Sequence, residues 1–290
     1  MPAALSHAPA LPAMSAFTLL RALLKSPQRR PRHPPPASLP DLVTEYRLDA
    51  LPFEAIARYR AAFGFAAEGV PLTWWYLIAQ RAHLATMLSP GFPFRIAGLV
   101  HMDNALRAHR QPPAGQTLLV HTVLRLLPPS SSGALRCVLE TTGSAGGEPV
   151  FACASTYLVR RGTRSGARSG AKPAEPGRSP PGAPLAQWTL DADAGRRYAR
   201  LSGDWNPIHL YGWSARLMGM RAPIIHGMHT LAKACAALER PGRHAVAIDC
   251  AFRAPVALGS TVTLSADAGS GEFVVSSAGK PAVTGTCTLA

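Results

Sequence analysis

The sequence lacks the features that identify several large classes of protein. It has no run of about 18 uncharged apolar residues, so no transmembrane helix is expected. Its cysteines are odd in number, are widely spaced and form no CxxC pair. They are Cys137, Cys153, Cys235, Cys250 and Cys287. This pattern argues against a disulfide framework or a cysteine zinc site. It favours small buried side chains in a reducing compartment.

Acidic residues are also scarce. The 290 residues contain 16 Asp and Glu against 30 Lys and Arg, which gives a formal charge of +14. Residues 1–40 contain no acid and residues 160–184 contain one, and each stretch carries a net charge of +5. These two stretches therefore supply ten of the fourteen charges. Because Arg160–Arg178 contains no aromatic residue on which a base could stack, we predict no nucleic-acid partner.

The two basic stretches also organise the chain. The first contains apolar residues at helical spacing, which predict a short amphipathic helix from Ser15 to Ser26, followed by a disordered Pro-rich and Arg-rich segment. The second, residues 160–184, has the composition of a flexible linker. It separates the predicted domains 41–159 and 185–290. A signal peptide is not indicated, because the positive charges follow the apolar stretch; a cytoplasmic location is favoured and the mitochondrial matrix stays open.

Each half contains a helix pattern followed by four strand patterns. The predicted helices are 72–88 and 228–239, and the predicted strands are 96–107, 117–127, 134–143, 150–159, 244–253, 260–267, 272–278 and 282–289. The halves also match locally, because residues 105–120 align with 251–265. This weak repeat predicts two copies of one unit, a helix packed on a curved antiparallel sheet, which is an α+β fold.

The segment that carries chemistry runs from Tyr198 to Ala215. Within it, Gly203 permits a tight bend, Asn206 is a good helix N-cap, and the proline after it suits the first helical position. Asp204 and His209 are thereby fixed five residues apart on a constrained turn. A carboxylate and an imidazole held close together can bind one water molecule and divide its proton transfers. This pair is the candidate catalytic centre.

The same segment resembles the signature of the R-specific enoyl-CoA hydratases, also called hydratase 2 or MaoC-like dehydratases. That signature is an aromatic residue, then Ser-Gly-Asp-x-Asn-Pro-aliphatic-His, then a small residue six positions on. Residues 198–215 fit it throughout, and Ile225-His226-Gly227-Met228 opens the second predicted helix as the family requires. The first half departs from the pattern. Its nearest analogue, residues 101–104, lies in a predicted strand and is interpreted as structural.

The resemblance implies a double hot-dog fold with the catalytic motif kept only in the second half. It implies that the protein adds water to trans-2-enoyl thioesters, with CoA as the favoured carrier. The products would be (3R)-3-hydroxyacyl thioesters, and the reverse reaction is dehydration. Asp204 and His209 would share the water, and the Gly227 amide would bind the thioester carbonyl as an oxyanion hole. Ser202, Gly203 and Asn206 would support the loop. No cofactor is implied, because CoA enters only as part of the substrate.

Several alternatives stay open. The substrate could be a specialised acyl-CoA or an acyl-carrier-protein thioester, and a hot-dog protein that binds thioesters without turnover is a further reading. Acyl chain length, physiological direction and a homodimer are not decided. His226 and His229 are three residues apart with no carboxylate nearby, so no metal site is predicted.

Some side chains have both a functional and a structural interpretation. Four cations of the second half could meet CoA phosphates, namely Arg216, Arg221, Arg253 and Lys280. Two groups of large apolar side chains could line the acyl site or simply pack within the fold. The first is Trp74, Trp75, Tyr76, Met87 and Leu88, and the second is Trp205, Tyr211 and Trp213.

Overall fold

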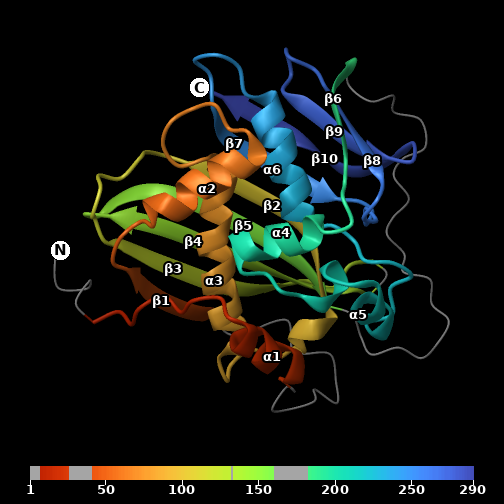
Figure 1. Cartoon of the computed structure of the whole chain (residues 1–290). Helices are drawn as coiled ribbons and strands as arrows, with labels where there is room; N and C mark the ends of the chain where they lie inside the picture. Colours follow the sequence, from red (N-terminus) through yellow and green to blue (C-terminus); the bar gives the residue numbers. More distant parts are fainter. Residues whose placement is uncertain (1–6, 26–40, 132, 160–181) are drawn as a thin grey trace. The chain divides into compact units, whose positions relative to one another are not determined.

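The structure, a computed structural model, describes residues 7–25, 41–131, 133–159 and 182–290 (Figure 1). The chain divides into two compact units. Unit 1 comprises Met1–Pro52 and Trp75–Ala167, and unit 2 comprises Phe53–Trp74 and Arg168–Ala290. The predicted disordered segment after the first helix, and most of the predicted linker, fall on residues 26–40 and 160–181, which lie outside the described part.

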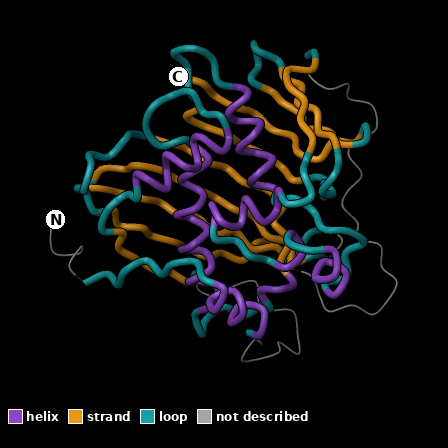
Figure 2. The backbone as a smooth tube through the Cα atoms, in the orientation of Figure 1, coloured by secondary structure: helices purple, strands orange, loops and turns teal. Residues whose placement is uncertain are grey.

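Unit 1 packs one helix against a five-stranded antiparallel sheet with strand order β1-β3-β4-β5-β2. The helix, α3, contacts all five strands (Figure 2). Trp75, Ile78, Ala79 and Ala82 are each at most 1% exposed, as expected for a helix enclosed by a sheet. The elements are α1 (Ala16–Leu24), β1 (Leu42–Leu48), α3 (Trp75–Leu88), the 3-10 turn η3 (Ile96–Gly98), β2 (Leu99–Ala108), β3 (Leu118–Leu127), β4 (Leu135–Ala145) and β5 (Glu148–Val159).

Unit 2 repeats this plan with strand order β6-β8-β9-β10-β7. Its long helix, α6, packs against β7 and β10. The elements are α2 (Phe53–Phe63), η2 (Leu72–Trp74), β6 (Pro184–Thr189), α4 (Ala194–Ser202), η4 (Pro207–His209), α5 (Gly212–Leu217), α6 (Gly227–Leu238), β7 (Ala245–Phe252), β8 (Thr261–Ala266), β9 (Glu272–Ser277) and β10 (Lys280–Leu289). The aligned segments 105–120 and 251–265 span the equivalent connections β2–β3 and β7–β8.

One segment does not follow the predicted division of the chain. Residues 53–74 were assigned to the first domain, yet they belong to unit 2. The reason lies in the aromatic side chains of α2, which packs on α4 and α6. The Phe63 ring lies 6.0 Å from that of Tyr198 and 5.3 Å from that of His229, measured between centroids. Helix α2 was not among the predicted elements, and a local pattern does not show which core a helix joins.

The packing of the apolar and cysteine residues follows the predicted pattern. All five cysteines are buried. In unit 1, the Trp75 ring stacks on Phe151 at 5.0 Å and Met87 belongs to the core, so these two side chains fill the interior of the unit. His101 of the motif analogue stacks on Tyr157 at 4.9 Å, which supports its structural interpretation. Among the described helices, none has the length and apolar character needed to cross a membrane.

Candidate active site

The catalytic motif follows directly from the end of α4. Gly203 ends this helix in the left-handed conformation, with φ +76°, and its N–H donates to the Ala199 carbonyl. A side chain at this φ would be strained, which explains why glycine occupies the bend. The chain then reverses toward η4, so that Asp204 and His209 come from the two sides of one tight connection.

Short-range hydrogen bonds hold this connection in place. Ser202 Oγ donates to the Tyr198 carbonyl at 2.9 Å and accepts the Asp204 N–H at 3.1 Å. Asp204 Oδ1 accepts the Asn206 N–H at 3.1 Å. Asn206 in turn caps η4 by accepting the Ile208 N–H at 3.4 Å, with proline at the first position of the turn. The structure thus places Ser202, Gly203 and Asn206 where they fix the Asp204 backbone and carboxylate.

His209 is buried and held in one tautomer. Its Nδ1 lies 2.8 Å from the Ile224 carbonyl oxygen, which can only accept, so Nδ1 carries the proton. This leaves Nε2 as the ring atom that can exchange a proton with water or substrate. Burial, reinforced by the neighbouring His226, lowers the pKa of His209 to about 3. The imidazole is therefore neutral near pH 7 and offers a lone pair at Nε2.

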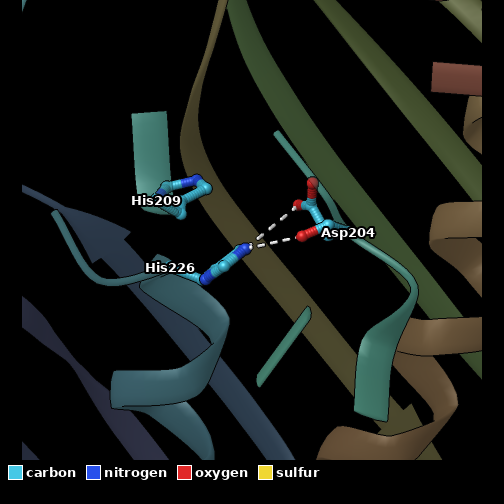
Figure 3. Close-up of side chains that lie close together, drawn as sticks. All are labelled: Asp204, His209 and His226. Atoms are coloured by element: carbon cyan, nitrogen blue, oxygen red, sulfur yellow. Dashed lines mark hydrogen bonds and ion pairs between the residues drawn. The ribbon is translucent and has the colours of Figure 1, made fainter. Parts of the chain in front are cut away.

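His226 completes a compact group with the predicted pair, as Figure 3 shows. Its ring stacks on that of His209 with centroids 3.7 Å apart. Its Nε2 donates to the Asp204 carbonyl at 3.0 Å and lies 4.0 Å from Asp204 Oδ2. Burial lowers the pKa of His226 to about 3, so it too is neutral. From the sequence, His226 was part of the motif that opens the second helix and was rejected as a metal ligand, whereas the structure puts it against both catalytic candidates.

These three side chains also have the composition of a metal site. One ligand atom from each of Asp204, His209 and His226 lies within 4.8 Å of the other two. His226 Nε2 already gives its proton to the Asp204 carbonyl, and His209 Nδ1 is committed to Ile224. An ion would have to break the first of these hydrogen bonds. The donor set therefore suits a water molecule held for proton transfer better than a metal ion.

Gly227 is the first residue of α6, where backbone N–H groups have no partner within the helix. The side chain of the N-cap residue, His226, does not cap these groups. A Cβ at position 227 would lie 2.7 Å from the Phe252 ring, so only glycine fits here. The helix start thus presents amide donors and positive potential close to the His226 ring.

The four candidate phosphate-binding cations fall into two places. All of them are exposed. Arg253 directly follows the end of β7, and its N–H donates to the carbonyl of Ala282 on β10. Lys280 is the first residue of β10, so these two cations lie at the ends of adjacent strands. Arg216 lies on α5 and Arg221 in the segment after it. Tyr211 and Trp213 flank the start of α5 and are 47% and 68% exposed, so neither packs under the catalytic loop.

Sequence reasoning missed a second residue of the site besides His226. Gly195, in the first turn of α4, faces the backbone of His209, and a Cβ there would lie 1.9 Å from the His209 carbonyl oxygen. Helix α4 therefore lies directly against η4 and fixes the position of His209. The signal in the sequence was a glycine inside a helix pattern, which usually marks a close approach.

The buried histidines make stability depend on pH. Burial lowers the pKa of His209, His226 and His229 to about 3 each, from 6.5 in an exposed state. Between these values the unfolded chain binds more protons than the folded one, so the free energy of unfolding falls as pH falls. Each histidine contributes a slope of about 1.4 kcal/mol per pH unit below pH 6.5.

We expect urea denaturation to show a clear loss of stability between pH 7 and pH 5, a window in which ordinary carboxylates stay ionised. A free energy of unfolding that stays constant over this window would contradict the burial of these rings.

Comparisons with known proteins show what the chain resembles. Residues 172–288 match the family described as MaoC like domain. The 3-hydroxyacyl-thioester dehydratase X of Mycobacterium tuberculosis is 29% identical over 217 residues, covering 74% of this chain and 76% of that protein. The mouse peroxisomal multifunctional enzyme type 2 is 29% identical over 165 residues, which cover 54% of this chain but 22% of that larger protein.

Solved structures share the fold. The crystal structure of the M. tuberculosis dehydratase aligns with a TM-score of 0.66 and 24% identity, over 84% of this chain and 98% of its own. Another M. tuberculosis protein, described as a double hotdog, aligns with a TM-score of 0.53 and 16% identity, over 86% and 96%. The α+β double hot-dog prediction is confirmed. The chain is similar to the M. tuberculosis dehydratase, and its residues 172–288 match the MaoC like domain.

Proposed function

We propose that this protein adds water to trans-2-enoyl thioesters, CoA thioesters in the first place, to give (3R)-3-hydroxyacyl thioesters, and catalyses the reverse dehydration. The observation that carries the proposal is the grouping of Asp204 with a neutral, oriented His209 beside the start of α6. The homology to a 3-hydroxyacyl-thioester dehydratase supports the class of reaction. The stereochemistry and the carrier rest on the resemblance of residues 198–215 to the hydratase 2 signature.

The pair would act on one water molecule. Near neutral pH His209 Nε2 is a proton acceptor, because Nδ1 donates its hydrogen bond to the Ile224 carbonyl. The Asp204 carboxylate accepts hydrogen bonds as well. As the water oxygen bonds to C3 of the enoyl group, one of the pair takes a proton from it. C2 receives a proton on the same face, so no net proton is consumed. Because burial disfavours the imidazolium, any proton taken by His209 is readily given up again.

The start of α6 would stabilise the charge that forms during this addition. Electron density moves from C2 to the thioester oxygen, which becomes enolate-like. The Gly227 N–H is a fixed donor at a helix N-terminus, and such a donor typically contributes about 3–4 kcal/mol to the barrier. A side chain at position 227 would clash with the Phe252 ring, so glycine leaves this amide uncovered by a side chain of its own. For the CoA phosphates, Arg253 is a candidate cation, because it directly follows Phe252, whose ring lies against Gly227.

His226 would be a positioning residue for the pair. It holds the Asp204 carbonyl and lies against the His209 ring, whose pKa it helps to lower. We expect His226→Leu to lower kcat about tenfold and to move the acidic limb of the kcat/KM profile to higher pH, because His209 then becomes easier to protonate. His226→Gln keeps an N–H donor and should retain more activity. A loss of activity without any shift of the pH profile would contradict this role.

A direct assay tests the proposed function. Crotonyl-CoA and longer trans-2-enoyl-CoAs are incubated with the full chain, and loss of the enoyl absorbance is followed with time. Turnover that the His209→Gln variant lacks is the expected result. Absence of turnover across all acyl lengths and carriers would overturn the proposal.

A further inference from the structure

An exposed apolar surface lies next to the candidate active site on α5. We name it the α5 ridge and define it by Tyr211, Trp213, Leu217 and Met218. Trp213 is 68% exposed and Leu217 80%, and the Tyr211 and Trp213 rings stack with centroids 6.3 Å apart. Exposed aromatic and aliphatic side chains gathered in this way on a soluble protein commonly mark an interaction site.

The ridge is fixed rather than loosely attached. The Arg196 side chain of α4 donates to the Leu210 carbonyl at 2.9 Å and lies 4.9 Å from the centroid of the Tyr211 ring. Ser214 Oγ donates to the Pro207 carbonyl at 2.7 Å, which ties α5 to the turn that carries His209. Trp213 is four residues from His209, so their Cα atoms are at most about 14 Å apart. A partner on the ridge would therefore sit within reach of the catalytic pair.

The segment that forms the ridge carries charge of one sign. Between Asp204 and Glu239 the sequence contains no acidic residue. Arg216 lies one helical turn from Trp213 on the same face of α5 and is exposed, and Arg221 is exposed in the segment that follows. Arg200 lies one turn along α4 from Arg196 and is also exposed. A surface with apolar side chains at its centre and arginines around it fits an acidic protein better than it fits a nucleotide.

We propose that the α5 ridge is the docking surface for a small acidic carrier protein that brings the acyl thioester on its phosphopantetheine arm. This inference rests on the proposed function, because it names the carrier of the same substrate. Trp213 and Leu217 supply the apolar contact, and Arg216 and Arg221 face the acidic residues of the carrier. Tryptophan and arginine are also the residues most often responsible for binding energy at protein interfaces.

The test compares one trans-2-enoyl group on three carriers, namely pantetheine, CoA and an acidic acyl carrier protein of a dissociated fatty acid synthase. For the Trp213→Ser/Leu217→Ser variant we expect kcat/KM to fall at least tenfold with the carrier-protein thioester and to stay within about twofold with the other two. The matched control is Phe53→Ser/Leu185→Ser, which removes two other exposed apolar side chains of unit 2 and should change none of the three values. Higher ionic strength should slow the carrier-protein reaction and leave the pantetheine reaction unchanged.

Other outcomes overturn the inference. An equal loss with all three substrates would show that the ridge merely supports the active site. A loss with CoA alone would make it a nucleotide subsite, and no loss with the carrier protein would exclude docking there.

If the wild-type chain turns over none of the three, the proposed function fails instead. Calorimetric titration with the carrier protein in its phosphopantetheine form then tests the ridge separately. Binding that the double variant weakens at least tenfold would support the surface, and unchanged or absent binding would overturn it.

Discussion

Replacing His209 by glutamine, or Asp204 by asparagine, is expected to lower kcat for thioester hydration at least a hundredfold. Each change removes a group that accepts a proton or a hydrogen bond from the attacking water, and such general acid–base groups typically contribute about 10²–10⁴-fold. Glutamine at position 209 can still donate to the Ile224 carbonyl, so the loop keeps that hydrogen bond. The effect should therefore be on chemistry and not on folding.

Two control variants change the same kinds of side chain outside the candidate active site. Glu54→Gln changes a carboxylate that is 95% exposed on α2, and His244→Ala changes an exposed imidazole, so neither should alter turnover. The kcat of the double variant at positions 204 and 209 should be only slightly lower than that of the less active single variant, because the effects of residues that act as a unit do not add. Retained activity in both single variants would remove the basis of the proposed mechanism.

Gly195→Ala is the second change with a large expected effect. The new Cβ would lie 1.9 Å from the His209 carbonyl oxygen, and because that atom is backbone it cannot swing aside. Either α4 or the turn bearing His209 must move. We expect a loss of about 1–3 kcal/mol in the free energy of unfolding, which is typical of overpacking, and at least a tenfold loss of kcat.

Gly212→Ala provides the matched control for this prediction. Gly212 begins α5, and a Cβ there would meet no atom within 4 Å. Both the stability and the activity of this variant should match those of the wild-type chain, or stability should rise slightly because alanine favours the helix. Thermal unfolding and the hydration assay on both variants test the pair. Equal behaviour of the two alanine variants would contradict the close approach of α4 to His209.

Local patterns predicted most of the fold. The strand expected at 117–127 is Leu118–Leu127, and the helix expected at 228–239 is Gly227–Leu238. Apolar alternation and glycine or proline at the connections are enough to place such elements. The patterns did not predict β1 and β6, the edge strands of their units, because no residue of either strand is fully buried and their sequences carry little apolar alternation. The membership of α2 in unit 2 depends on long-range aromatic packing.

The candidate site was predicted in part for a similar reason. Asp204 and His209 lie on one turn, so their proximity could be read from five residues of sequence and from the family signature. His226 lies 17 residues after His209, and its stacking on that ring depends on how α6 is placed against the loop. Gly195 acts through the absence of a side chain. Neither contact has a local pattern, so both needed the folded structure.

The stereochemistry of the product tests the central claim most directly. The full chain is incubated with a trans-2-enoyl-CoA, and the 3-hydroxyacyl product is released and resolved by chiral chromatography, with the His209→Gln variant run beside it. We predict the (3R) product from the wild-type chain and at least a hundredfold less of it from the variant. An S product, or equal amounts of product from the two chains, would contradict the assignment of Asp204 and His209 as the hydratase pair.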